Sequence, residues 1–152
     1  MPQLYSGYRL RLGRYSEPNR IYLLTSVTHD RKPIFSDWKL GRLVVNEFRR
    51  AQDQKMAGSL AWVVMPDHFH WLIELRDSDL SNLMRQVKTR SAFAITNSVG
   101  KQFQVWQKGY HDRALREEND ILHAARYIIA NPLRAGLAKR YGDYPLWDAV
   151  WL

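Results

Sequence analysis

The sequence predicts an α+β fold, in which a four-stranded antiparallel sheet has helices packed on one of its faces. Two observations support this prediction. Runs rich in β-branched and aromatic residues alternate with segments whose apolar residues recur at helical spacing. Two of the strand-like runs are separated only by Pro66 and Asp67, a pair that favours a tight turn and therefore an antiparallel hairpin.

The first half of the chain contains three predicted strands and one helix. Residues 21–28 form an uninterrupted β-branched and aromatic run, which predicts a central strand. Residues 37–55 carry an apolar stripe at helical spacing, with Ser36 or Asp37 in position to cap the helix. Residues 59–65 and 68–75 are the two strands of the hairpin.

The second half adds two helices and one short strand. Residues 79–98 have helical periodicity, and Gly100 is expected to end that helix. Residues 110–115 predict a short fourth strand. A last helix is expected over residues 118–131, with acidic residues in its first turn and Pro132 stopping it.

The order β-α-β-β-α-β-α is typical of a ferredoxin-like sheet, in which the first and third strands are central. The length of 152 residues suits a single domain over residues 1–152. Within it we expect a basic and aromatic arm over 1–19, or alternatively a flexible terminus whose aromatic residues cover the core. Residues 133–152 form a loop-rich tail whose Tyr144, Trp147 and Trp151 are expected to pack onto the core.

The charge indicates a polyanionic partner. Lysine and arginine number 23 against 15 acidic residues, which gives a formal charge of +8 and favours nucleic acid. The absence of cysteine excludes disulfides and thiolate metal sites, so any metal must be bound through nitrogen and oxygen. No long apolar run occurs, and we therefore expect a cytoplasmic, DNA-associated protein without a membrane segment.

Two residue pairs are candidates for chemistry. His68 and His70 alternate along one strand, so both imidazoles lie on the same face about 7 Å apart and can reach one metal ion. Tyr127 and Asn131 are four residues apart on the last helix, which puts a phenol and an amide on one face. Taken separately, each pair has an ordinary alternative: surface or core histidines, and a core-edge tyrosine with a C-capping asparagine.

Three segments together resemble a known family. They are VVMPDHFHWLIEL, VWQKGYHDRALR and ARYIIANPLRAGL. Their His-hydrophobe-His strand, W-Q-x-x-Y segment and Y-I-x-x-N-P ending are similar to the single-tyrosine, IS200-like transposases of bacterial insertion sequences, and most of all to their REP-associated tyrosine transposase branch. The resemblance extends from about residue 22 to residue 137.

The resemblance implies a ferredoxin-like HUH endonuclease core that cleaves and rejoins single-stranded DNA near hairpins. It implies that His68 and His70 are metal ligands, that Tyr127 is the nucleophile forming a 5′-phosphotyrosine, and that Asn131 is a third ligand. Mg²⁺ or Mn²⁺ is the metal that the family implies, whereas imidazole ligands alone also allow zinc. No nucleotide cofactor is expected, because the reaction exchanges one phosphodiester for another and the sequence has no phosphate-cradling glycine motif.

Further residues are candidates for supporting roles. His111 and Glu74 are candidate accessory groups at the active site. A phosphate track is expected from basic residues of the arm, the second helix, the fourth strand and the end of the last helix: Arg9, Arg11, Arg14, Arg85, Lys88, Arg90, Arg113, Arg116 and Arg134.

Alternative functions also follow from the same residues. One is a domesticated, non-catalytic protein that binds hairpin DNA or RNA. Another is a phosphoesterase that uses water in place of Tyr127, and a third is a replication-initiator or relaxase nuclease, which we would expect in a longer chain. The sequence allows either a monomer or a homodimer.

Overall fold

The computed structural model describes residues 20–150 of the chain. Residues 1–19 and 151–152, which include Arg9, Arg11, Arg14 and Trp151, lie outside the described residues.

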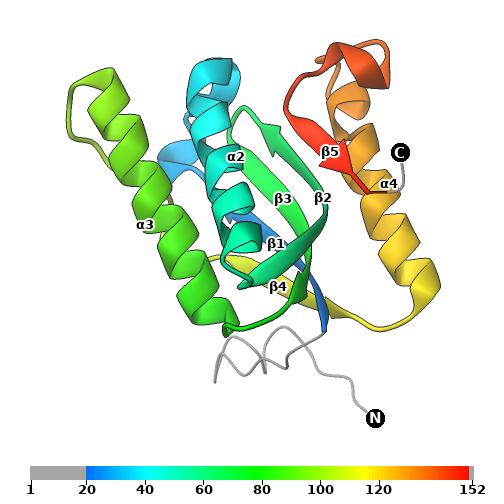
Figure 1. Cartoon of the computed structure of the whole chain (residues 1–152). Helices are drawn as coiled ribbons and strands as arrows, with labels where there is room; N and C mark the ends of the chain where they lie inside the picture. Colours follow the sequence, from blue (N-terminus) through cyan, green and yellow to red (C-terminus); the bar gives the residue numbers. More distant parts are fainter. Residues whose placement is uncertain (1–19, 151–152) are drawn as a thin grey trace.

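A five-stranded antiparallel sheet organises the described chain (Figure 1). Its strands lie in the order β4-β1-β3-β2-β5, and their bounds are β1 Ile21–Val27, β2 Ala57–Met65, β3 His68–Leu75, β4 His111–Leu115 and β5 Trp147–Ala149. The α-helices are α2 Trp38–Asp53, α3 Leu80–Val99 and α4 Glu118–Arg134. Short 3-10 turns occupy His29–Arg31, Ile34–Ser36 and Tyr141–Asp143.

One face of the sheet packs against α2 through aromatic side chains, and the buried apolar residues of α3 belong to the same core. Phe48 of α2 stacks on Trp71 of β3 with ring centroids 4.4 Å apart and meets Phe69 edge-on at 5.1 Å. All three side chains are almost fully buried. This aromatic layer fixes β3 against α2, so the residues that alternate with Phe69 and Trp71 must point to the other face.

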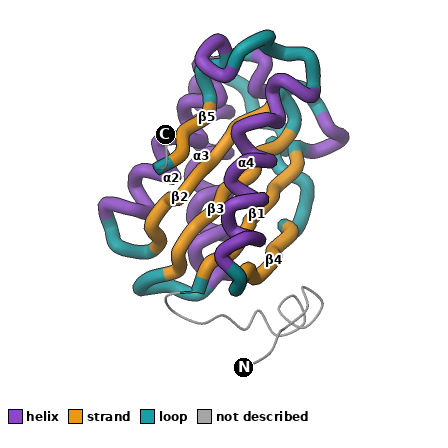
Figure 2. The backbone as a smooth tube through the Cα atoms, turned by 90° about the vertical axis from the view of Figure 1, so that its right-hand side faces the viewer, coloured by secondary structure: helices purple, strands orange, loops and turns teal. Residues whose placement is uncertain are grey.

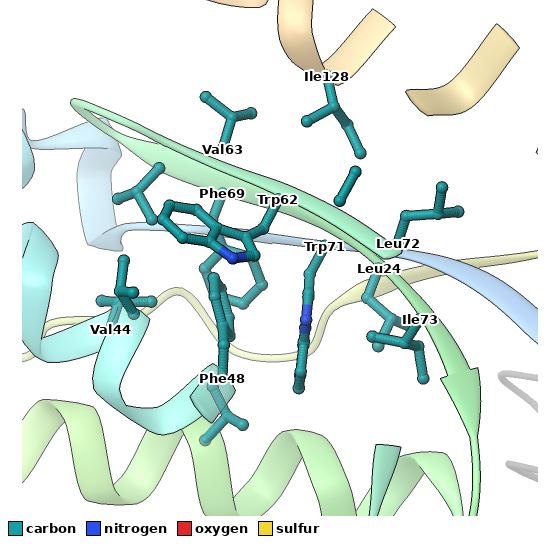
Figure 3. Close-up of a cluster of buried hydrophobic side chains, with 14 of the residues drawn as sticks. Leu24, Val44, Phe48, Trp62, Val63, Phe69, Trp71, Leu72, Ile73 and Ile128 are labelled. Atoms are coloured by element: carbon teal, nitrogen blue, oxygen red, sulfur yellow. The ribbon is translucent and has the colours of Figure 1, made fainter. Parts of the chain in front are cut away.

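The opposite face of the sheet packs against α4 (Figure 2). Val63 of β2 and the fully buried Ile128 of α4 lie on one side of the sheet, whereas Phe48 and Trp71 lie on the other (Figure 3). The tail after α4 returns to β2, where the Tyr144 hydroxyl donates to the Val64 carbonyl at 2.6 Å. The helix is therefore held over the face of β3 that carries the two histidines.

The α+β class, the order of the elements and the central places of β1 and β3 are confirmed. Asp37 caps α2 by accepting from the Lys39 amide, and Gly100 ends α3 in the left-handed conformation, as predicted. The packing of Tyr144 and Trp147 onto the core is also confirmed, since Tyr144 is buried and Trp147 packs against the core cluster.

Three details of the fold differ from expectation. The sheet has a fifth strand, β5, which is only three residues long and is defined by pairing with β2 rather than by its own sequence pattern. The helices are not all on one face, because helical periodicity marks an apolar stripe without specifying the surface that it covers. Pro132 does not stop α4 at the preceding residue, because the helix continues to Arg134. Proline lacks a backbone N–H and crowds the carbonyl four residues back, and the helix ends only two residues later.

Among residues 20–150, no helix combines the length and the apolar character that crossing a bilayer requires.

Candidate functional site

The site is built on β3, the middle strand of the sheet. β1 and β2 pair with β3 on its two sides over most of its length. His68 and His70 point to the α4 face, with their ring centroids 4.9 Å apart and their planes at 75°. Strand alternation thus brings the two imidazoles together on a mount that is hydrogen-bonded along both edges.

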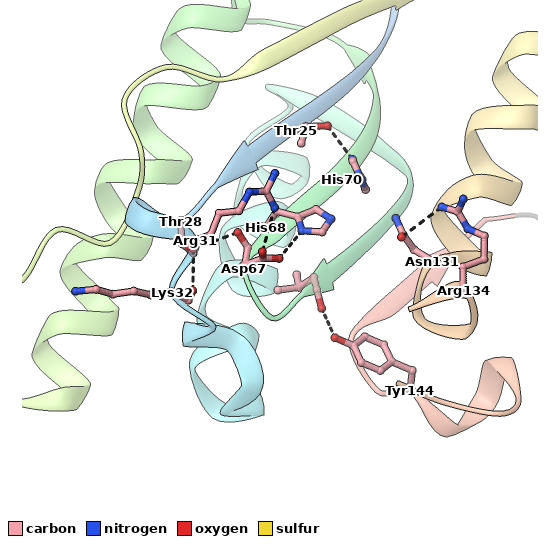
Figure 4. A network of polar contacts seen from close by, with 11 residues as sticks. Thr25, Thr28, Arg31, Lys32, Asp67, His68, His70, Asn131, Arg134 and Tyr144 are labelled. Atoms are coloured by element: carbon pink, nitrogen blue, oxygen red, sulfur yellow. Dashed lines mark hydrogen bonds and ion pairs between the residues drawn. The ribbon is translucent and has the colours of Figure 1, made fainter. Parts of the chain in front are cut away.

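Each histidine is held by its Nδ1 atom (Figure 4). His68 Nδ1 donates to Asp67 Oδ1 at 2.7 Å, and Arg31 donates to the other carboxylate oxygen at 3.0 Å. The Nδ1 atom of His70 lies 2.7 Å from Thr25 Oγ1 of β1, which accepts its proton in the matching tautomer. This leaves the Nε2 atoms of both rings to bind a further group, as in metal-ligating histidines oriented by an outer partner.

The surroundings keep His70 neutral. Its burial, followed by the positive charges of His68 and Arg134, lowers the pKa of His70 to about 4. Burial acts to raise the pKa of Asp67, but the hydrogen bonds and charges of His68 and Arg31 outweigh it and lower that pKa below its usual value. A neutral imidazole and an ionised carboxylate are the protonation states that ligand binding at Nε2 requires.

Helix α4 brings Tyr127 to the same place. The ring of Tyr127 lies with its centroid 5.4 Å from that of His70, and the side chain remains 42% exposed. The guanidinium of Arg134 lies 4.2 Å from the centroid of the Tyr127 ring and also donates to Asn131 Oδ1 at 3.4 Å. The partly exposed phenol ring therefore contacts both an imidazole and a guanidinium.

Asn131 is buried beside this group, on the side of α4 that faces the two histidines (Figure 4). Its Nδ2 atom has no hydrogen-bond partner within the described part of the chain. Nδ2 is a donor, so leaving it unpartnered in a buried place is costly, and an acceptor oxygen of a bound molecule would satisfy it. Only the Oδ1 atom, which here accepts from Arg134, could ligate a metal ion.

A cleft of about 450 Å³ opens in front of these residues. It is lined by side chains from the sheet and from α4: Leu23, His70, Arg113, Asp120, His123, Ala124 and Tyr127. The cleft offers a cation, two imidazoles and a phenol to a bound molecule.

The comparison with protein families decides the family. The profile described as "Transposase IS200 like" matches residues 18–131, which include both histidines, Tyr127 and Asn131. The chain belongs to the IS200-like transposase family. The resemblance inferred from the three sequence segments is thereby confirmed.

Individual relatives of this IS200-like transposase agree with the assignment. It is 33% identical over 87 residues to the REP-associated tyrosine transposase of Escherichia coli strain K12, an alignment that covers 56% of this chain and half of that protein. It is 25% identical over 143 residues to a Haemophilus influenzae protein provisionally given the same name, covering 82% of this chain and 77% of the relative. The chain thus spans only half the length of the first of these relatives.

Two solved structures share the fold of this IS200-like transposase. A REP-associated tyrosine transposase bound to a REP hairpin superimposes with a TM-score of 0.70 at 25% identity, covering 88% of this chain and 79% of that one. A transposase assigned provisionally from Deinococcus radiodurans R1 gives a TM-score of 0.50 at 18% identity, covering 75% and 91% of the two chains, and shows the fold alone.

The donor set of this IS200-like transposase fits a divalent ion that is bound by few protein groups. Within residues 20–150, no three His, Asp or Glu side chains are grouped to hold a metal. The described chain offers two oriented imidazoles and the Oδ1 atom of Asn131, which would have to exchange its contact with Arg134 for the ion. Water and other oxygen ligands would complete the shell. Nitrogen and oxygen donors of this kind suit Mn²⁺ or Mg²⁺ and do not exclude zinc.

The structure separates the other predicted residues of the transposase. Glu74 is four residues along β3 from His70, roughly 13 Å away, and pairs with Arg76 at 2.9 Å. His111 of β4 is in register with Thr25 of β1, which is in register with His70 of β3. His111 is therefore on the same face as His70, with β1 lying between their two strands. Glu74 therefore lies apart from the site, and His111 lies at its margin.

The predicted DNA contacts also divide between the two faces. Arg113 lines the cleft and Arg134 adjoins Tyr127. Arg116 follows β4 immediately. The remaining three are on α3, across the sheet from the histidines, and each makes a contact within the protein: Arg85 with Asn82, Lys88 with the carbonyls of Gln107 and Gly109, and Arg90 with Glu47.

Sequence reasoning did not find Thr25, Asp67, Asp120 and His123. Asp67 was detectable, because it directly precedes His68 and belongs to the turn of the hairpin. Thr25 was not, because its place beside His70 depends on the register between β1 and β3. Asp120 and His123 share a helical face with Tyr127, a signal that becomes informative only once the cleft is known.

Proposed function

We propose that this protein cleaves and rejoins single-stranded DNA beside a hairpin, through a covalent bond to Tyr127. The observation that carries the proposal is the edge-to-face contact of Tyr127 with His70, with ring centroids 5.4 Å apart, in the lining of an open cleft. Exposure alone does not distinguish Tyr127, since Tyr141 is also exposed; what distinguishes Tyr127 is its place beside an oriented imidazole.

The reaction is a transesterification at phosphorus. The Tyr127 oxygen attacks the scissile phosphate and loses its proton, while the bond from phosphorus to the 3′ oxygen breaks and that oxygen is protonated. The products are a 5′-phosphotyrosine and a free 3′-hydroxyl. Because one phosphodiester replaces another, a 3′-hydroxyl can attack the adduct and rejoin the strand without a nucleotide cofactor.

The chain's own residues orient this reaction. His68, His70 and Asn131 would hold a divalent ion, which when bound supplies positive charge to polarise the phosphate. Arg134 stacks on the Tyr127 ring and limits its rotation, and Arg113 offers a guanidinium to a phosphate in the cleft. Preorganised cations of this kind stabilise the charge that develops on phosphate oxygens.

Hairpin DNA is the proposed substrate for two reasons. The solved relative with a TM-score of 0.70 is described as bound to a REP hairpin. The chain also has a net charge of +8, which favours a polyanion. We infer that the protein acts on DNA in the cytoplasm.

The test is a denaturing gel with end-labelled single-stranded hairpins and Mg²⁺ or Mn²⁺. We expect wild-type protein to yield a cut strand and a slower-migrating protein–DNA adduct on the 5′ side. Tyr127→Phe should bind DNA but yield neither product, and His68→Ala should reduce both strongly. Tyr141→Phe is the matched control, because Tyr141 is an exposed tyrosine on the 3-10 turn after α4.

Each outcome has a distinct meaning. Undiminished cutting by Tyr127→Phe would rule out the covalent mechanism and favour hydrolysis by water. Binding without cutting by the wild type, over a broad panel of hairpins, would favour a protein that only binds nucleic acid.

A further inference from the structure

A second pocket adjoins the cleft on the same face of the sheet. It has a volume of about 300 Å³ and is lined by Thr25, Val27, Gln107, Lys108, Gly109, Tyr110 and His111. We call it the 107–111 pocket. We propose that it binds one unpaired nucleotide of the DNA strand, next to the phosphate that Tyr127 attacks, and reads its base through Gln107 and His111. This inference rests on the proposed function.

The pocket and the catalytic cleft are consecutive along the same two strands. On β1, Leu23 lines the cleft whereas Thr25 and Val27 line the pocket; on β4, Arg113 lines the cleft whereas His111 lines the pocket. Thr25 joins the two, because it lines the pocket and also bonds His70 Nδ1 at 2.7 Å. A strand lying along β1 and β4 would thus meet both hollows in succession.

The separation between them suits neighbouring nucleotides. His111 is in register with Thr25, and Thr25 with His70, so the Cα atoms of His111 and His70 are two strand spacings apart, roughly 10 Å. A nucleotide next to a phosphate bound at His70 and Tyr127 therefore reaches the 107–111 pocket.

Hydrogen bonds to α3 and β1 hold the loop segment that forms one wall of the 107–111 pocket. Lys88 of α3 donates to the backbone carbonyls of Gln107 and Gly109, and the backbone N–H of Gln107 donates to the Val27 carbonyl at 2.9 Å. The preceding Trp106 is buried, with its indole nitrogen donating to Ser91 Oγ at 3.0 Å. The loop is thus held in place before any ligand arrives, which lowers the entropic cost of binding.

The lining has the chemistry of a nucleotide site. The Gln107 amide can donate and accept at once, as an adenine edge requires, and His111 adds a second polar group at the rim. Tyr110 packs against the core with its hydroxyl buried and contributes an apolar part of the lining, and the exposed Lys108 supplies charge for a phosphate. This mixture suits a nucleobase with its phosphate better than an apolar ligand.

The test measures binding of labelled hairpins to protein carrying Tyr127→Phe, so that cleavage does not interfere. In a series of hairpins, each unpaired nucleotide beside the cleavage site is replaced in turn by an abasic one. We expect one position at which the abasic change weakens binding about tenfold, the loss expected when the hydrogen bonds to one base are removed. Gln107→Ala and His111→Ala should weaken binding to the intact hairpin. With either substitution, the abasic change at that same position should no longer reduce the affinity.

Gln102→Ala is the matched control, since Gln102 is an exposed glutamine in the preceding loop and outside the pocket. It should leave the abasic profile unchanged. If the pocket substitutions and the loss of a base weakened binding additively at every position, the nucleotide subsite would be overturned. The proposed cleavage would remain intact in that case. Failure of unsubstituted protein to bind or cut any hairpin would overturn both.

Discussion

His68 and His70 are chemically alike in the sequence but have different partners in the fold. His68 is hydrogen-bonded to the ionised Asp67, whereas His70 is hydrogen-bonded to the neutral hydroxyl of Thr25. A carboxylate partner raises the basicity of the ligating nitrogen, and both partners hold a ring in one orientation. Asp67 is thus expected to affect the site through His68.

We predict that Asp67→Asn lowers the affinity for Mn²⁺ about 10- to 100-fold, the usual effect of losing an outer partner of a ligating histidine. Isothermal titration of the purified protein with Mn²⁺ measures this directly. Asp77→Asn, a substitution at an exposed aspartate beyond the end of β3, serves as the control. Equal affinities for the two variants would contradict an orienting role for Asp67.

Arg134 is predicted to position the nucleophile. Arg134→Ala removes the guanidinium over the Tyr127 ring and its hydrogen bond to Asn131. Cation–π contacts are worth about 0.5 to 2 kcal/mol, so we expect adduct formation to slow roughly 3- to 30-fold at saturating DNA. Arg126→Ala removes the same charge from an exposed position next to Tyr127. If both substitutions slowed the reaction equally, Arg134 would act through charge alone.

At the scale of elements, α4 decides whether a site exists at all. The helix carries Tyr127, Asn131 and Arg134, and the sheet carries the histidines, so the site forms only when α4 lies on β2 and β3. Ile128, fully buried next to Tyr127, is the largest of the buried apolar side chains that α4 contributes to this contact.

We therefore predict that Ile128→Ala lowers both stability and activity. Truncating a buried isoleucine costs about 2 to 5 kcal/mol, and adduct formation should fall because Tyr127 loses its anchor. Urea unfolding and the gel assay measure the two effects. Ile129→Ala, at the neighbouring half-buried position, should cost less in both. If Ile128→Ala lowered the free energy of unfolding as expected but left adduct formation unchanged, docking of α4 through Ile128 would not be required for the reaction.

The tail after α4 predicts a pH effect on stability. Burial raises the pKa of Tyr144 to about 12, and its hydroxyl donates to the Val64 carbonyl. Because tyrosines in an unfolded chain titrate near 10, this contribution is present below about pH 10 and is lost as the pH rises toward 12. Urea unfolding from pH 8 to 11.5 should show wild type losing its advantage over Tyr144→Phe. A constant difference would contradict the raised pKa.

Over the whole molecule, the two faces of the sheet have different tasks. The face that carries Phe69 and Trp71 is closed by α2 and α3 and provides the aromatic core. The face that carries the histidines holds the cleft, the 107–111 pocket and the cations nearest to them. DNA is expected on this second face only.

The salt dependence of DNA binding tests that assignment. For single strands, the logarithm of the affinity falls with the logarithm of salt by about 0.7 for each phosphate contact. Arg113→Ala should therefore reduce the slope by about 0.7, whereas Arg49→Ala, at an exposed position on α2, should leave it unchanged. Fluorescence anisotropy at salt concentrations from about 50 to about 300 mM gives both slopes. A reduced slope for Arg49→Ala would place DNA on the α2 face.

The sequence by itself determined the strands, the helices and the pairing of residues within each of them. His68 with His70, and Tyr127 with Asn131, follow from the periods of a strand and a helix, which are local properties of the backbone. Asp37 as a cap and Gly100 as a stop are equally local. The match to the IS200-like family arose from combining these local patterns.

Only the tertiary structure decided which of these elements meet. The register of β1 on β3 puts Thr25 on His70, the packing of α4 puts Tyr127 and Arg134 beside it, and β2 recruits the three residues of β5. An apolar stripe states that a helix face is buried but not against which surface, and a strand pattern does not name its partner. The basic residues of α3 and β4 look alike in the sequence, yet the sheet separates them onto opposite faces.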